Sequence, residues 1–303
     1  MNAGVIFLDK PLGWTSRRAV NEVIRMFSKP GEKKIKAGHT GTLDPLATGM
    51  LPILLGEATR FSDLGLQADK RYRVSLDLTY QTDTLDCEGE ITARFDGHQD
   101  ADKIREVVAS FEGKQQQVPP IYSAIRVDGR RAHAMARAGE TVTLESRSVD
   151  IQRIEILELS LPVLTLDVTC SKGTYIRSLA RDIGQTLGLG GCVTALRRIS
   201  TGGWPEAMMV TAEHVHEHPE PSVLPLRQWL REWPDVCLSE GDARRFLNGQ
   251  RVPVDDTVDG TVVVMHQNTV LGTAMLKAGQ YRHVLHPLKI LPSAQKVWLN
   301  HAG

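Results

Sequence analysis

AGHTGTLDPLATG, which runs from Ala37 to Gly49, is the most informative segment of this 303-residue chain. Four residues separate His39 from Asp44, and these include a glycine and two threonines. Such small residues let a backbone approach a ligand closely, and a following proline biases Asp44 toward an extended conformation. The segment therefore predicts a loop that holds one carboxylate rigidly. From these residues alone, an Asx-type turn in which Asp44 satisfies only local amides remains an alternative.

The elements on either side of this loop predict a mixed α+β domain. Apolar residues follow a helical spacing at 15–27, 104–111 and 176–187, and they alternate with polar residues at 74–80 and 164–170. The first pattern is typical of amphipathic helices and the second of strands with one buried face. Because there is neither a regular βαβ period nor a glycine-rich phosphate loop, a mixed sheet fits better than a doubly wound parallel one.

The last third of the chain predicts a smaller, strand-rich unit. Residues 213–225 contain three prolines with acidic and histidine residues, which is typical of an inter-domain connection. A helix is expected at 240–247, and 262–265 and 270–276 read as the arms of a hairpin. His214, His216 and His218 alternate as metal ligands can, but no cysteine is near them, so no metal site is expected.

Composition leaves the partner of the protein open. The chain has 36 basic and 36 acidic residues. Cations gather at 25–36, 126–137 and 177–198, whereas anions gather at 83–102. The basic segments either converge into a stripe that follows a phosphate backbone, with the acidic segment pointing elsewhere, or form ordinary solvated surface.

Cysteine usage and hydropathy predict a soluble cytoplasmic protein. The four cysteines form no C-x-x-C pair, so they are expected to be buried thiols in a reducing compartment rather than zinc ligands. No stretch approaches the ~20 consecutive apolar residues that a membrane span needs.

Several separate blocks resemble, in the same order, the bacterial tRNA pseudouridine synthase B (TruB) family. The resemblance spans most of residues 4–200, and its blocks are LDKPLGWTS at 8–16, AGHTGTLDPLATGML at 37–51, KRYRV at 70–74, TDTLDCEG at 82–89, QVPPIYSAIRVDGRRAHAMARAGE at 117–140 and SKGTYIRSLARDIG at 171–184. It implies a pseudouridine synthase-type mixed β-sheet catalytic domain at 1–230, with a basic RNA-contacting insertion at about 117–148. A small, strand-rich, PUA-like RNA-binding domain is expected at 236–296.

The resemblance also implies an activity and a minimal catalytic set. The expected reaction isomerises the T-loop uridine at position 55 of tRNA to pseudouridine, with the target base flipped out. Asp44 matches the catalytic aspartate of the family, Arg177 the arginine that pairs with it, and Tyr72 the tyrosine that stacks on the base and serves in proton transfer. Whether Asp44 attacks C6, attacks C1′ or abstracts the 2′ proton remains open. Because the isomerisation needs no redox change or group donor, no cofactor and no metal are expected.

Three further residues match substrate-contacting positions of the family. His39 corresponds to a histidine that enters the RNA loop beside the flipped nucleotides, and Tyr175 and Leu196 correspond to residues in contact with the substrate. The expected partner is tRNA, through its T-loop and T-stem, with no protein partner and no membrane, and the chain is expected to be a monomer.

Two positions depart from the family pattern. Arg126 stands where a lysine is usual and His133 where a tyrosine is usual, which affects RNA affinity rather than the type of reaction.

Two other functions are alternatives to this one. The first is a tRNA-binding or tRNA-folding module with little catalytic role. A hydrolase with Ser16, His39 and Asp44 as a triad is disfavoured, because the chain lacks a nucleophile elbow.

Overall fold

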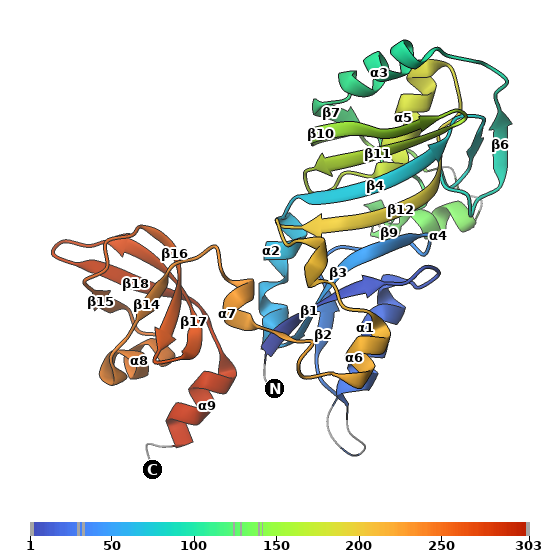
Figure 1. The fold of residues 1–303 in the computed structure, drawn as a ribbon. Coiled ribbons are helices and arrows are strands. Elements are labelled where there is room, and N and C mark those ends of the chain that lie inside the picture. The colour runs from blue at the N-terminus through green and yellow to red at the C-terminus, as the bar shows by residue number, and fades with distance from the viewer. Residues whose placement is uncertain are drawn as a thin grey trace.

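A mixed sheet forms the larger part of the molecule (Figure 1). The computed structural model describes residues 3–28, 31, 34–123, 125–127, 129–138, 140 and 142–300, without the side chains of 126, 131, 133, 136, 137, 299 and 300. Along the sheet the strand order is β13-β1-β3-β12-β4-β11-β10-β7, and β2 also pairs with β3. The strands are β1 (Ala3–Lys10), β2 (Ala37–His39), β3 (Ala47–Gly56), β4 (Lys70–Asp77), β7 (Gly113–Gln117), β10 (Arg147–Ser160), β11 (Val163–Cys170), β12 (Cys192–Thr201) and β13 (Leu224–Pro225).

Strand β12 occupies the centre of this sheet. It runs parallel to β3 and antiparallel to β4, whereas the other neighbouring pairs are antiparallel. Residues of β4 alternate between buried and partly exposed positions, as the period of two predicts. Strands β1 and β3 are buried along almost their whole length, because the second sheet and the helices cover both faces.

Helices cover the sheet where the apolar spacing predicted them. Helix α1 (Ser16–Phe27) begins after Thr15, whose side chain accepts a hydrogen bond from the Arg18 amide. Helix α5 (Ile176–Leu187) ends at Gly188, which adopts the left-handed conformation with φ +70°. The other elements of this part are η1 (Glu57–Phe61), α2 (Ser62–Gln67), β5 (Tyr80–Thr82), β6 (Ile91–Arg94), α3 (Ala101–Ser110), β8 (Arg126–Val127), β9 (Arg130–Arg131), α4 (Ala132–Arg137), η2 (Glu206–Met208), α6 (Ala212–Glu217) and α7 (Leu226–Trp229).

A second, five-stranded sheet follows, as the sequence predicted (Figure 1). It contains β14 (Asp235–Cys237), β15 (Val252–Val254), β16 (Gly260–His266), β17 (Thr269–Ala278) and β18 (His283–Ile290), with α8 (Glu240–Leu247) and α9 (Pro292–Asn300) beside it. One hydrophobic cluster joins the two sheets, since Phe7 and Phe61 of the larger part pack in the same cluster as Val263. The Glu57 carboxylate also accepts hydrogen bonds from the Ser293 amide and hydroxyl, at 2.8 and 2.5 Å.

The segment 213–225, predicted to be an inter-domain connection, packs on the larger unit. Helix α6 covers residues 213–217 of it, and its Val215 is fully buried in the core of the large sheet. Strand β13 then pairs with β1. Prolines and acidic residues indicate solvent, but a single buried valine is enough to dock a short helix.

The expectation of four buried thiols is only partly met. Cys170 and Cys192 are buried, but Cys87 and Cys237 are exposed. The Arg126 and His133 side chains lie outside the described residues. Within the described part of the chain, no helix is both long and apolar enough to cross a membrane.

Candidate active site

Asp44 lies in a loop, residues 40–46, that connects β2 to β3 and is pinned at both sides; we call it the Asp44 loop. The Ser16 hydroxyl at the start of α1 donates to the Leu43 carbonyl at 2.9 Å and accepts from the Leu43 amide at 2.8 Å. The Ala47 amide closes the other side by donating to the Asp44 carbonyl at 3.1 Å. The loop therefore presents its carboxylate, 38% exposed, from a fixed backbone.

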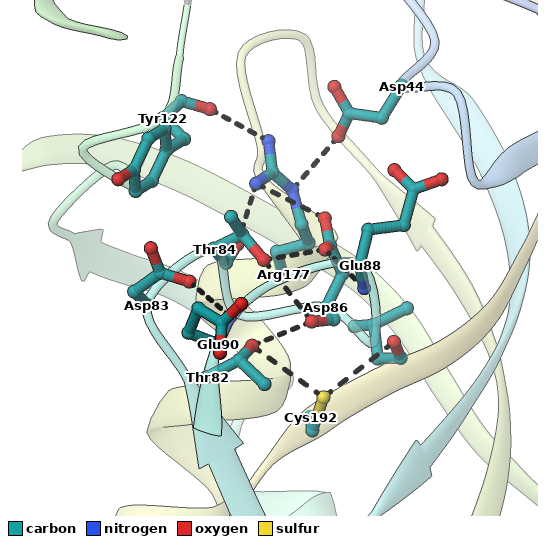
Figure 2. A network of polar contacts seen from close by, with 11 residues as sticks. Asp44, Thr82, Asp83, Thr84, Asp86, Glu88, Glu90, Tyr122, Arg177 and Cys192 are labelled. Atoms are coloured by element: carbon teal, nitrogen blue, oxygen red, sulfur yellow. Dashed lines mark hydrogen bonds and ion pairs between the residues drawn. The ribbon is translucent and has the colours of Figure 1, made fainter. Parts of the chain in front are cut away.

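The partner of this carboxylate is a buried arginine, not a local amide (Figure 2). Arg177, in the first turn of α5, places its Nε 2.9 Å from Oδ2 of Asp44. Its Nη1 donates to the Thr84 carbonyl at 2.7 Å, and its Nη2 donates to the Tyr122 carbonyl at 3.0 Å. The guanidinium is thus held from several directions, so the geometry favours the predicted pair over the Asx-type turn.

A second carboxylate under Arg177 was not predicted. Asp86 is 4% exposed, and its Oδ2 lies 3.5 Å from Nη1 of Arg177. Its Oδ1 accepts from the Thr84 hydroxyl at 2.6 Å and from the Glu88 amide at 3.2 Å (Figure 2). The sequence signal was the TDTLDCEG block, whose individual residues had been given no role.

The acidic segment 83–102 points elsewhere only if the basic segments converge into a stripe, which was one of two alternatives; its first residues lie at the site. Asp86 contacts Arg177, and burial together with the nearby Asp86 and Asp44 carboxylates raises the pKa of Glu88. This end of the segment therefore belongs to the electrostatics of the site, because it balances the positive charge of Arg177.

One cavity of about 280 Å³ brings most of the predicted residues together. Asp44, Tyr72, Tyr175, Arg177 and Leu196 all line it. Their elements lie far apart in the sequence, so the fold creates the cavity rather than any local motif. Its lining also includes polar residues that the sequence did not single out, among them Lys70, Ser123, Ser171 and Arg198.

Aromatic rings stand at two sides of this cavity. Tyr72 on β4 is 8% exposed, and burial raises the pKa of its phenol. Tyr175 precedes α5, and its backbone is fixed by Gln117, whose side chain donates to the Tyr175 carbonyl at 3.1 Å and accepts from its amide at 2.8 Å. The guanidinium of Arg147 lies 5.6 Å from the centre of the Tyr175 ring. Flat apolar faces of this kind suit an unstacked base.

His39 stands apart from the other predicted residues. It ends β2 and is not among the residues that line the cavity. Its Nδ1 is buried without a hydrogen-bond partner in the described part of the chain. Burial, with Arg198 and Arg17 nearby, lowers the pKa of His39, which favours the neutral ring. A neutral ring donates one hydrogen bond and accepts another.

Lys70 is a buried cation of the cavity that the sequence did not identify. Its Nζ donates to the carbonyls of Gly65, Leu66 and Ala68 at 2.9, 3.0 and 2.6 Å, at the carboxyl end of α2. Burial and the charge of Arg198 lower its pKa to about 8. The negative end of the helix dipole explains how the ammonium is tolerated there.

The cations of the basic segment 177–198 do not form an exposed stripe that could follow a phosphate backbone. Arg177 and Arg198 are buried, Arg181 contacts Asp182 at 2.8 Å, and Arg197 contacts Asp9 at 2.9 Å. These cations are therefore used inside the protein or in surface ion pairs. Among the described residues, no group of three or more His, Cys, Asp or Glu is placed to hold a metal ion.

The chain is similar to proteins of one known family. Residues 28–176 match the TruB family pseudouridylate synthase N-terminal domain, and residues 177–231 match the tRNA pseudouridylate synthase B C-terminal domain. A tRNA pseudouridine synthase B from Pseudomonas aeruginosa (strain UCBPP-PA14) is 43% identical over 258 residues, which are 82% of this chain and 83% of the relative. One from Cupriavidus metallidurans is 42% identical over 294 residues, 92% of each chain.

A solved structure shares the fold over nearly the whole chain. A chain in the crystal structure of a Cbf5-Nop10-Gar1 complex aligns with a TM-score of 0.70 and 25% identity, covering 95% of this chain and 84% of that one. Sequence and fold agree, and the chain belongs to the TruB family of pseudouridylate synthases.

Proposed function

We propose that this protein is a tRNA pseudouridine synthase that isomerises the T-loop uridine at position 55, with Asp44 as its catalytic carboxylate. In this reaction the bond between C1′ of the ribose and N1 of uracil breaks, and a bond between C1′ and C5 of the same base forms. The C5 proton leaves and N1 gains a proton, so the product is an isomer of the substrate. No electrons or groups are exchanged, and the proposal therefore includes no cofactor or metal.

The observation that carries this proposal is the Asp44–Arg177 contact at a cavity lined by Tyr72. A flipped uridine whose base stacks on Tyr72 brings its sugar toward the Asp44 carboxylate. Arg177, whose Nε lies 2.9 Å from Oδ2, orients that carboxylate. An oriented carboxylate serves each open route, whether it attacks C6, attacks C1′ or abstracts the 2′ proton.

The remaining family positions complete the proposal as binding groups. Tyr175 and Leu196 form walls for the flipped nucleotide, and His39 contacts the neighbouring RNA outside the cavity. The basic insertion at about 117–148 closes on the T-stem and T-loop, and the PUA-like unit at 236–296 binds a more distant part of the tRNA. The protein acts as a cytoplasmic monomer, without a protein partner.

The test uses a tRNA transcript labelled with tritium at C5 of uridine. Formation of the C1′–C5 bond releases that tritium, and sequencing of the product locates the pseudouridine. We expect the wild type to release one tritium per tRNA, at position 55. Asp44→Asn should release none while it still binds tRNA, because the amide keeps the shape of the side chain but removes its charge.

Asp102→Asn supplies the matched control, because this carboxylate is 98% exposed on α3 and is not among the residues lining the cavity. It should react like the wild type. Product at another uridine would refute the assignment of position 55, and product from Asp44→Asn would refute the role of Asp44. Binding without any product by the wild type would favour a tRNA-folding module instead.

A further inference from the structure

Arg198 is the most unusual buried group of the cavity. It lies on β12, is 1% exposed, and is the largest fully buried side chain among those that the structure describes. The described residues place no carboxylate within ion-pair distance of it, in contrast to the adjacent Arg197, which contacts Asp9 and Glu206. Burying a guanidinium without a counterion opposes folding, and an apolar side chain would fill the same space more favourably. This position therefore has a requirement other than stability.

The hydrogen bonds of Arg198 connect three elements around the cavity. Its Nε donates to the Met50 carbonyl on β3 at 2.6 Å, and its Nη2 donates to the Gly41 carbonyl in the Asp44 loop at 3.2 Å. The positive charge of the guanidinium also acts on the phenol of Tyr72 on β4, and both side chains line the cavity. One planar group thus bonds to the loop that presents the carboxylate and lies beside the ring proposed to stack on the base.

The backbone around Arg198 fixes where its side chain begins. In the sheet, Arg198 is paired with Gly49 of β3 on one side and with Tyr72 of β4 on the other. Gly49 has φ +94°, and a Cβ atom there would lie 2.3 Å from the Arg198 carbonyl oxygen. The two strands therefore approach so closely at this point that the root of the side chain has little freedom.

We propose that Arg198 is a positioning residue that sets the relation between the Tyr72 ring and the Asp44 loop. This inference rests on the proposed function, since the relation matters only if a base stacks on Tyr72 while Asp44 reacts at its nucleotide. A guanidinium suits the role because its donors point in fixed directions within one plane. A lysine ammonium at the same position would be a single point and could not hold the Met50 and Gly41 carbonyls together in the directions that the guanidinium fixes.

The experiment compares Arg198→Lys and Arg198→Met with Arg197→Met, which removes the neighbouring arginine and its surface ion pairs. Single-turnover rates are measured at saturating tRNA, with tRNA affinity and thermal unfolding measured in parallel. We expect both Arg198 variants to lose ~10²-fold in rate, as for a misplacement of about 1 Å, with tRNA affinity unchanged. Arg197→Met should lose stability and keep the wild-type rate.

A double-mutant cycle with Tyr72→Phe distinguishes positioning from a general effect on packing. Tyr72→Phe keeps the ring but removes the phenol oxygen on which the charge of Arg198 acts. Its rate should fall, and adding Arg198→Met should lower the rate by less than the product of the two single effects, because both changes break the same link.

Three results would overturn the inference while leaving the proposed function intact: a wild-type rate for Arg198→Lys, fully additive effects in the cycle, or a rate loss matched by loss of tRNA affinity. If the Arg198 variants do not fold, Tyr72→Phe decides alone, since a wild-type rate there would refute the link. An inactive wild type would refute the proposed function itself, so the two failures are distinguishable.

Discussion

Replacing Arg177 by methionine would leave its two carboxylates in very different environments. Asp86 is 5% exposed and would remain buried without a cation, whereas Asp44 is 38% exposed and would be solvated by water. The carbonyls of Thr84 and Tyr122 would also lose their donor. We therefore expect Arg177→Met to destabilise the fold mainly through Asp86, not through the proposed catalytic residue.

The magnitude follows from the geometry. At the 3.5 Å that separates Nη1 of Arg177 from Oδ2 of Asp86, an effective dielectric constant of about 20 gives an attraction of ~5 kcal/mol. Removing one partner of a buried pair typically costs ~3–5 kcal/mol, because the other charge stays buried. For a chain of this length, roughly 2 °C per kcal/mol then gives a fall in Tm of about 6–10 °C.

The decisive measurement is a rescue. In the Arg177→Met background, Asp86→Asn removes the orphaned charge while its side-chain oxygen still accepts from the Thr84 hydroxyl and the Glu88 amide. We expect it to restore ~1–3 kcal/mol, measured by calorimetric or circular dichroism melting. Asp44→Asn in the same background serves as the control and should restore little. If Asp86→Asn instead lowers the Tm further, the charge on Asp86 is not the source of the instability and the reasoning fails.

Three further predictions concern stability. Burial lowers the pKa of Lys70 to about 8, so between pH 8 and pH 10.5 the unfolded chain binds more protons than the folded protein. In urea unfolding, the wild type should therefore gain stability relative to Lys70→Met as the pH rises through this window. The gain should reach up to about 1.4 kcal/mol per pH unit. A pH-independent difference would contradict this. Gly49→Ala should lower the free energy of unfolding in urea by ~2–5 kcal/mol, because it combines a positive φ with a clash at 2.3 Å. Gly13 also has a positive φ, but a Cβ there would meet nothing within 4 Å, so Gly13→Ala should cost only ~1–2 kcal/mol. Equal losses would refute the clash. Removing residues 235–303 should uncover Phe7 and Phe61 and cause aggregation in size-exclusion chromatography, and a monomeric truncated chain would show that the shared cluster is dispensable.

Periodicity alone predicted the elements that have one clearly buried face. Helix α5 begins and ends where the apolar stripe did, and the predicted hairpin is formed by β16 and β17. Strands β1 and β3 were not predicted, because an apolar run that is buried on both faces shows no alternation to detect. Local patterns therefore identified elements with a polar side and missed strands that are buried on both faces.

Some residues of the candidate site were predicted from the sequence and others were missed. The resemblance identified Asp44, Arg177, Tyr72, Tyr175 and Leu196, and the fold brings these to one cavity. Asp86 and Arg198 were missed because their significance depends on distant contacts, such as the hydrogen bond from Arg198 to Gly41 across 157 positions of sequence. Lys70 bonds to nearby carbonyls, but its place in the cavity depends on elements far away in the sequence. No local window contains such information.

Consecutive arginines on β12 show why register, rather than composition, decides what a charge does. Side chains alternate across a strand, so Arg197 and Arg198 must point to opposite faces. Arg197 meets surface carboxylates, while Arg198 lines the cavity with Leu196, two positions away on the same face. A shift of one residue in the pairing with β3 and β4 would exchange the two arginines and place the ion-paired one inside the site. At the observed register a Cβ on residue 49 would lie 2.3 Å from the Arg198 carbonyl oxygen, so the pairing that turns Arg198 into the cavity requires a glycine at this position.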